Sequence, residues 1–124
     1  MNGKLVDTNI LIYLSQKKLP LEKIANKDMK LYISVITYME ALGYPFKDQA
    51  EQQLMERICN VFEVIQLEQT IVDQVILIRR QHKIKLPDAI ILATASSSKL
   101  DLVTANTSDF QNIDHTINLI NPMV

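Results

Sequence analysis

Short apolar runs rich in β-branched residues alternate along the chain with longer stretches of helical period. The runs that predict strands span residues 4–6, 31–35, 61–67, 100–105 and 116–120. The stretches that predict helices span residues 8–18, 20–27, 35–44, 49–60, 68–82 and 87–99. This alternation predicts an α/β fold, in which helices cover both faces of a mainly parallel sheet.

Several of the predicted helices carry residues that are typical of a helix start. Ser34 can cap the helix that follows it, and Asp48 stands at the start of a stretch that resembles a capping box. Pro20 and Pro87 stand where a first-turn proline begins a helix. These residues support the helix starts that the periodicity predicts.

Length and composition limit the class of protein. A chain of 124 residues with 48% hydrophobic content suits a single domain over residues 1–124. The formal net charge of −1 excludes a global basic field, so any polyanion would have to be held locally. The single cysteine, Cys59, is expected to be a small buried hydrophobe in a reducing compartment. With no secretory signal and no membrane span in view, we expect a cytoplasmic protein without a membrane partner.

Acidic residues stand where an α/β fold of this kind places its ligands. Asp7 ends the first predicted strand, and Asp109 follows the fourth. Glu40 and Asp88 lie on predicted helices that begin at that edge of the sheet or close to it. Because ligands of open parallel sheets bind beyond the carboxyl ends of the strands, these carboxylates could converge if the first, second and fourth strands are neighbours. Converging acids repel one another, so they need raised pKa values or a divalent cation.

Each of these acids also has an ordinary structural explanation. Asp7 could cap the following helix, and Asp88 could interact favourably with a helix N-terminus. Glu40 could be a solvated surface residue, and Asp109 could complete a turn that Asn106 begins. The local sequence leaves these alternatives open at each position. Only the presence of all four acids at the same edge of the predicted sheet favours a common site.

The types of side chain available restrict the chemistry. Carboxylate oxygens suit a hard cation such as Mg²⁺ or Mn²⁺. His82 and His115 are isolated and are expected to be surface residues, so the sequence offers no zinc cluster. With only two glycines the chain has no phosphate-cradling loop and no dinucleotide fingerprint.

A basic stretch, "RRQHKIK", precedes Asp88 at residues 79–85. Cations are favoured at a helix C-terminus, so this stretch could be a solvated helix end. It could equally hold the phosphates of an RNA locally. The candidate RNA-binding residues are Arg79, Arg80, Lys83 and Lys85.

Four segments resemble the PIN-domain ribonucleases, and most closely the VapC-type toxins of type II toxin–antitoxin pairs. In order along the chain they are "LVDTNILIYL", "ISVITYMEALGY", "KLPDAIILATA" and "LVTANTSDF". The resemblance covers almost the whole chain. It implies a PIN-like three-layer α/β/α sandwich around a short, mainly parallel sheet, with an acidic pocket that binds Mg²⁺ or Mn²⁺.

The resemblance also implies roles for individual residues. The acidic quartet that acts in catalysis and metal binding would be Asp7, Glu40, Asp88 and Asp109, and the supporting polar residues would be Thr8, Asn9, Thr104 and Asn106. We expect Thr8 and Asn9 to cap the helix after the first strand and to leave Asp7 free for a metal.

The activity implied by the resemblance is metal-dependent hydrolysis of RNA phosphodiester bonds by an endoribonuclease, the toxin of a toxin–antitoxin pair. The implied partners are RNA, a cognate antitoxin protein and a second copy of the chain. Alternatives within the family are a non-toxin RNA-processing nuclease and a catalytically silent PIN-like interaction module. A phosphoacceptor signalling domain would need a lysine after the last strand, where "TINLINPMV" has none. A double-aspartate phosphatase would need an acid at the position of Asn9.

Overall fold

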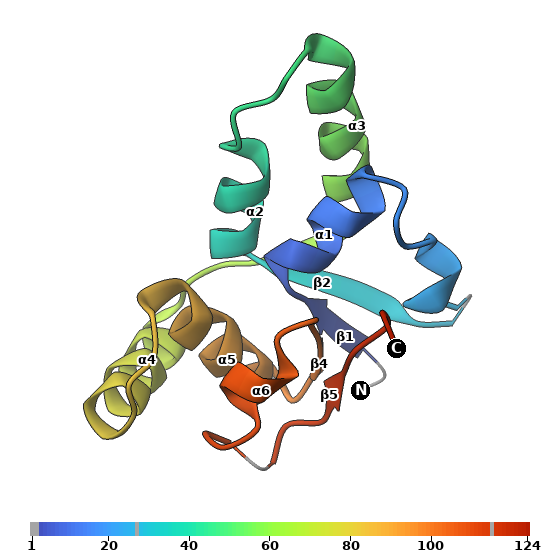
Figure 1. Ribbon diagram of the computed structural model, residues 1–124. Coiled ribbons are helices and arrows are strands. Elements are labelled where there is room, and N and C mark those ends of the chain that lie inside the picture. The colour runs from blue at the N-terminus through green and yellow to red at the C-terminus, as the bar shows by residue number, and fades with distance from the viewer. Residues whose placement is uncertain (1–2, 27, 115) are drawn as a thin grey trace.

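Five parallel strands form the centre of the fold, in the order β3-β2-β1-β4-β5 (Figure 1). The computed structural model describes residues 3–26, 28–114 and 116–124. The strands are β1 (Gly3–Val6), β2 (Lys30–Ser34), β3 (Glu63–Ile65), β4 (Asp101–Val103) and β5 (Leu119–Ile120). Every pairing is parallel, and Leu5 of β1 lies opposite Tyr32 on one side and Leu102 on the other. This arrangement confirms the predicted α/β fold.

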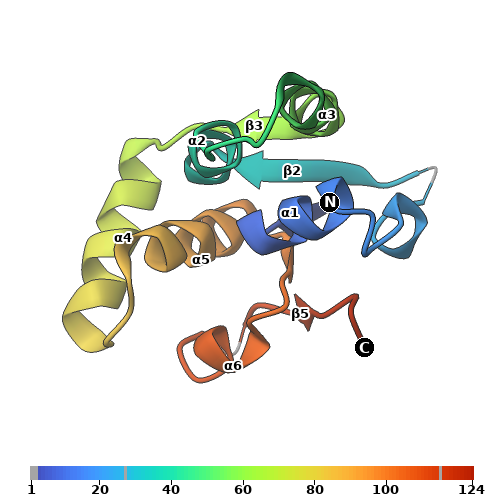
Figure 2. The same ribbon diagram turned by 45° about the horizontal axis from the view of Figure 1, so that its top comes forward.

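Helices connect the strands and cover the sheet. They are α1 (Thr8–Ser15), the 3-10 helix η1 (Leu21–Lys23), α2 (Val35–Leu42), α3 (Gln49–Cys59), α4 (Gln69–Gln81), α5 (Leu86–Ser98) and α6 (Thr107–Phe110). Figure 2 shows α4 and α5 side by side as a pair, with α2 close to α3. Among the described residues, none of the helices combines the length and the hydrophobicity that a membrane span requires.

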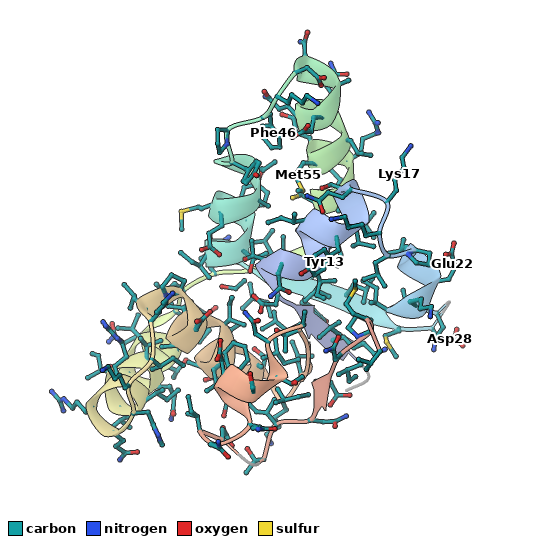
Figure 3. The ribbon with its side chains drawn as sticks, viewed as in Figure 1. Tyr13, Lys17, Glu22, Asp28, Phe46 and Met55 are labelled. Atoms are coloured by element: carbon teal, nitrogen blue, oxygen red, sulfur yellow. The ribbon has the colours of Figure 1, made fainter. Side chains whose placement is uncertain are left out.

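Successive side chains of the central strands enter opposite core layers. Leu5 packs in one layer with Ile91 of α5, whereas Val6 packs in the other layer with Met55 of α3. Figure 3 shows Met55 between α3 and α1. The same alternation places Tyr32 and Leu102 in the first layer and Ile33 and Val103 in the second. Because side chains alternate across a strand, each strand supplies both layers, which gives a three-layer α/β/α sandwich.

Two predicted helices are shorter than expected. The helix predicted over residues 20–27 is wrong, since only Leu21–Lys23 form a 3-10 turn and residue 27 lies outside the described residues. After this 3-10 turn, the side-chain oxygen of Asn26 accepts a hydrogen bond from the backbone N–H of Asp28 at 3.3 Å. The helix predicted over residues 8–18 ends at Ser15, because Lys17 takes a left-handed conformation with φ 60°.

Strand boundaries also differ from the prediction. The third strand begins only at Glu63, because the end of α3 continues into turns through Phe62, whose backbone N–H bonds to the carbonyl oxygen of Cys59 at 3.1 Å. The fifth strand is reduced to Leu119–Ile120. The remaining elements are present, with ends that differ from the predicted ones by one or two residues.

The predicted helix starts are largely confirmed. The hydroxyl oxygen of Ser34 accepts a hydrogen bond from the backbone N–H of Ile36 at 3.2 Å, and the Asp48 carboxylate accepts one from the backbone of Glu51 at 2.9 Å. Pro87 lies in the first turn of α5. Cys59 is buried, as expected, with 2% of its surface exposed.

Candidate active site

Asp7 follows β1 at the point where the order of the strands reverses. β1 lies between β2 and β4, and the chain continues outward from these two neighbours to β3 and β5. The backbone N–H of Asp7 donates to the carbonyl oxygen of Val103 at 2.9 Å, which holds Asp7 at the junction of β1 and β4. Only 4% of its surface is exposed. Such a switch point is where open parallel sheets bind their ligands.

Both carboxylate oxygens of Asp7 accept hydrogen bonds. Oδ1 accepts from the backbone N–H of Thr8 at 2.7 Å, which makes Asp7 the N-cap of α1. Oδ2 accepts from the hydroxyl of Thr104 at 2.8 Å and from the side-chain amide of Asn9 at 3.5 Å. The expectation that Thr8 and Asn9 cap this helix is therefore wrong. The extended backbone of Asp7 brings its own carboxylate to the free amide, as an N-cap requires.

The surroundings of Asp7 favour its neutral form. The pKa of Asp7 is raised from 3.8 to about 6, and burial is the largest cause. Hydrogen bonds from Thr104 and Thr8 lower the pKa, while the negative charges of Asp88 and Glu40 raise it. A carboxylate held in this state binds a proton or a cation more readily than an exposed one.

Asp88 interacts with each of the other acids through its charge. It lies half-buried in the first turn of α5. Burial raises the pKa of Asp88, the charges of Asp109 and Glu40 raise it further, and the positive charge of Lys85 lowers it. Asp88 in turn acts on Asp7. The structure thus brings the four acids of the sequence analysis into one electrostatic cluster with Asp88 at its centre.

Three of these acids line an open pocket of about 420 Å³. Its lining residues are Glu40, Lys83, Ile84, Lys85, Pro87, Asp88, Asn106 and Asp109. Asp7 is almost fully buried and is absent from this lining. The pocket therefore combines negative charge from three helices, α2, α5 and α6, with two lysines from the segment between α4 and α5.

The predicted basic stretch is divided between two hollows. Lys83 and Lys85 line the acidic pocket, whereas Arg79 and Arg80 line a second hollow of about 550 Å³. The two hollows share Lys83 and Ile84, so they adjoin at the turn between α4 and α5. His82 lines the second hollow and is half-buried, while His115 lies outside the described residues.

The predicted supporting residues connect these elements. The side-chain oxygen of Asn9 accepts a hydrogen bond from the backbone N–H of Ala105 at 3.5 Å. The backbone N–H of Asn106 donates to the hydroxyl oxygen of Thr104 at 3.0 Å. Asn106 occupies the N-cap position of α6, but its side chain makes no capping hydrogen bond, which disfavours the alternative that Asn106 caps this turn.

Glu40 is held by a hydroxyl group from another helix. The hydroxyl of Thr8 lies 2.7 Å from Oε1 of Glu40 and 3.0 Å from the hydroxyl oxygen of Thr37. Thr37 is fully buried, and its neighbours in the sequence do not distinguish it from a core threonine. Its position three residues before Glu40, on one helix face, is the only signal that could have indicated it.

The side chains of this site offer carboxylate, hydroxyl and amide oxygens, and these are the types of donor that a hard divalent cation prefers. Across residues 3–26, 28–114 and 116–124, no group of three or more Asp, Glu, His or Cys side chains has the spacing of a ready metal site. Mg²⁺ often binds only one or two carboxylates directly and keeps several waters.

Comparisons with known proteins agree with this fold. Residues 4–116 match the PIN domain model, and the chain belongs to this family. A comparison with curated proteins found no match.

The chain is also similar to solved structures over nearly its whole length. One is a toxin–antitoxin complex from Klebsiella pneumoniae, with 36% sequence identity over 96% of this chain and 97% of that chain and a TM-score of 0.75. VapBC2 from Rickettsia felis, bound to a promoter DNA fragment, is 23% identical over 96% of this chain and 98% of that chain, with a TM-score of 0.82. DNA-bound VapBC from Salmonella typhimurium is 23% identical over 98% of this chain and 99% of that chain, with a TM-score of 0.80. The last two matches show the fold, and the resemblance to PIN-domain toxins is confirmed.

Proposed function

We propose that the protein is a metal-dependent endoribonuclease that hydrolyses RNA phosphodiester bonds, and that it is the toxin of a toxin–antitoxin pair. The observation that carries this proposal is the electrostatic coupling of Asp88 to Asp7, Glu40 and Asp109 beside a pocket that also contains lysines. Membership of the PIN domain family supports it, because PIN domains are typically metal-dependent nucleases.

The residues that would hold Mg²⁺ or Mn²⁺ are Asp7, Glu40 and Asp88, and Asp109 would complete a second site or position a water. A bound divalent cation lowers the pKa of water and stabilises the charge that develops on the leaving oxygen. Thr104 donates a hydrogen bond to Asp7 and so favours its ionised form.

The remaining side chains of the pocket have supporting tasks. The hydroxyl of Thr8 orients the Glu40 carboxylate. Lys83 and Lys85 line the pocket and would neutralise the phosphates on either side of the cleaved bond. Arg79 and Arg80, in the adjoining hollow, would hold phosphates farther along the RNA.

The test compares Asp88→Asn and Asp7→Asn with the native chain in Mn²⁺-dependent cleavage of a structured RNA. Both variants should lose cleavage while circular dichroism shows an intact fold. Asp48→Asn is the matched control, because Asp48 is also a helix N-cap but is exposed and lies at the start of α3. Full activity in either site variant, or no activity in the native chain, would contradict the proposal. Expression in a bacterial host should arrest growth, and Asp7→Asn should restore it.

We also propose a cognate antitoxin protein as partner, because the Klebsiella pneumoniae relative comes from a toxin–antitoxin complex. An apolar groove of about 410 Å³ lies between α1, η1 and α3, and it suits the apolar face of a partner helix. Among its lining residues, Leu21 and Val61 are 38% and 52% exposed. Val61→Asp should weaken binding of an antitoxin without changing RNA cleavage, measured by calorimetry with the purified pair.

Self-association to a homodimer is part of the same proposal. Large apolar side chains stand exposed on two helices near the pocket, and burying such side chains stabilises association. They are Tyr38 and Met39 on α2 and Ile76 and Leu77 on α4. Light scattering should give twice the 14.2 kDa mass of the chain, and Ile76→Lys/Leu77→Lys should reduce it to the monomer value.

A further inference from the structure

Thr37 and Thr8 place two hydroxyl groups in line with the Glu40 carboxylate. Thr37 lies on α2, three residues before Glu40, and none of its surface is exposed. Its hydroxyl oxygen lies 3.0 Å from the hydroxyl of Thr8, which in turn lies 2.7 Å from Oε1 of Glu40. The three side chains thus form a chain of polar contacts that runs from the interior to the pocket.

The direction of these hydrogen bonds follows from the number of protons. An ionised carboxylate only accepts, so the single hydroxyl proton of Thr8 is donated to Glu40. The contact between the two threonines then requires Thr37 to donate to the oxygen of Thr8. Hydroxyl groups linked in this way polarise one another, which strengthens the bond to the carboxylate.

This arrangement differs from the usual one for a buried threonine in a helix. Thr94 of α5 is also buried, and its hydroxyl donates to the carbonyl oxygen of Ile90, one turn earlier, at 2.7 Å. The hydroxyl of Thr37 is instead directed to α1, where it meets Thr8. The hydroxyl of Thr94 therefore bonds within its own helix, whereas the hydroxyl of Thr37 connects two helices.

We propose that Thr37 is a positioning residue of the active site, which acts through Thr8 to fix the Glu40 carboxylate in the orientation that binds a divalent cation. Glu40 is exposed, so without the hydrogen bonds from Thr37 through Thr8 its long side chain would sample several rotamers. The inference rests on the proposed function, because it assigns Glu40 to the metal site. It adds a residue that lies outside the acidic quartet and its supporting polar residues.

The experiment measures Mn²⁺ affinity by calorimetry on the full chain, in the absence of RNA. Thr37→Val keeps the shape of the side chain and removes its hydroxyl, so the Kd for Mn²⁺ should rise about 2- to 10-fold. Thr37→Ser keeps the hydroxyl and should restore the native Kd. Thr94→Val removes a buried hydroxyl that does not face the site, and its Kd should equal that of the native chain.

A second pair of variants tests the same inference if Thr37→Val fails to fold. If Thr37→Val does not fold, Thr37→Ser and Thr37→Ala are compared, because they differ from each other only in the hydroxyl. The serine variant should bind Mn²⁺ about 2- to 10-fold more tightly than the alanine variant. Cleavage of RNA by Thr37→Val should return towards the native rate at saturating Mn²⁺, whereas a merely structural role would not move the Mn²⁺ midpoint.

The outcomes separate this inference from the proposed function. If the native chain binds Mn²⁺ and Thr37→Val binds it equally well, the positioning role is wrong and the nuclease proposal stands. Equal affinity of the serine and alanine variants would overturn it in the same way. If the native chain binds no Mn²⁺ and cleaves no RNA, the proposed function itself fails, and this inference fails with it.

Discussion

Thr104 donates a hydrogen bond from its hydroxyl to Oδ2 of Asp7 at 2.8 Å, although the two residues are 97 positions apart in the sequence. They are brought together because β1 and β4 are neighbours in the sheet. The hydroxyl oxygen of Thr104 also accepts from the backbone N–H of Asn106, so its one proton is directed at Asp7. The fold thereby offsets part of the cost of placing a charge at a buried position.

Thr104→Val should raise the pKa of Asp7 further above about 6, because the hydrogen bond from Thr104 lowers it in the native chain. The measurement is carbon-13 NMR of the Asp7 carboxyl group during a pH titration without divalent metal. The acid limb of the pH–rate profile for RNA cleavage should move upward in the same variant. Thr94→Val is the control, and an unchanged Asp7 titration in Thr104→Val would refute the assigned role.

The stability of the metal-free protein should fall as the pH rises from about 4 to above 6. The pKa of Asp7 is raised from 3.8 to about 6, so the folded state holds a proton that the unfolded chain releases. This difference corresponds to about 3 kcal/mol of unfolding free energy that is present below pH 3.8 and lost as the pH passes 6. The free energy of unfolding, measured by urea denaturation at several pH values between 4 and 8, tests this loss of stability.

Asp7→Asn should remove most of that pH dependence, because asparagine remains neutral. Its single amide oxygen can accept from Thr8 or from Thr104 but not from both, so one of these hydrogen bonds is lost. At pH 8 without metal this variant should be more stable than the native chain by about 1 to 3 kcal/mol, although it should not cleave RNA. Asp48→Asn makes the same substitution at an exposed N-cap and should show no such gain. A fall in stability from pH 4 to pH 8 that is as large in Asp7→Asn as in the native chain would show that the charge of Asp7 is not its cause.

Divalent cations should raise the melting temperature of the native chain, because a ligand that binds only the folded state stabilises it by mass action. The rise on adding Mn²⁺ should be larger at pH 7.5 than at pH 5, since protons compete for Asp7 below a pKa of about 6. Asp88→Asn should reduce the rise, because Asp88 interacts with Asp7, Glu40 and Asp109. Differential scanning fluorimetry measures all of these shifts, and an equal rise in Asp88→Asn would argue against a metal at this site.

The sequence predicted the sheet and the acidic cluster because each depends on strong, repeated signals. Alternating strands and helices imply a parallel sheet, and a parallel sheet brings the ends of its strands to one edge. Asp7 and Asp109 could therefore be placed from their positions after two strands. Asp88 was recognisable as an acid among basic residues at the start of an apolar helix.

Finer features could not be predicted, because they depend on single conformations or on distant partners. Lys17 ends α1 in a left-handed conformation that glycine or asparagine more often adopts, so the sequence carried no stop signal there. The cap of α1 could have come from Asp7, Thr8 or Asn9, and only the backbone geometry decides for Asp7. Thr37 looks like any threonine of a buried helix face until Thr8 is seen beside it.

Lys83 and Lys85 should contribute more to RNA binding than any equal number of lysines away from the pocket. Both line the acidic pocket, where phosphates next to the cleaved bond must lie if the proposed function is correct. Lys83→Ala/Lys85→Ala should weaken RNA binding and lower the slope of log K against log salt by about 1.4, since each phosphate contact to a single strand contributes about 0.7. Fluorescence anisotropy with Asp88→Asn as background, in which the RNA is not cleaved, gives both quantities.

Lys23→Ala/Lys47→Ala is the control, because it removes the same charge from exposed positions outside both hollows, and it should leave the slope unchanged. Equal slopes for the two double variants would show that net charge alone governs binding, and the assignment of the pocket lysines to phosphate would then be wrong.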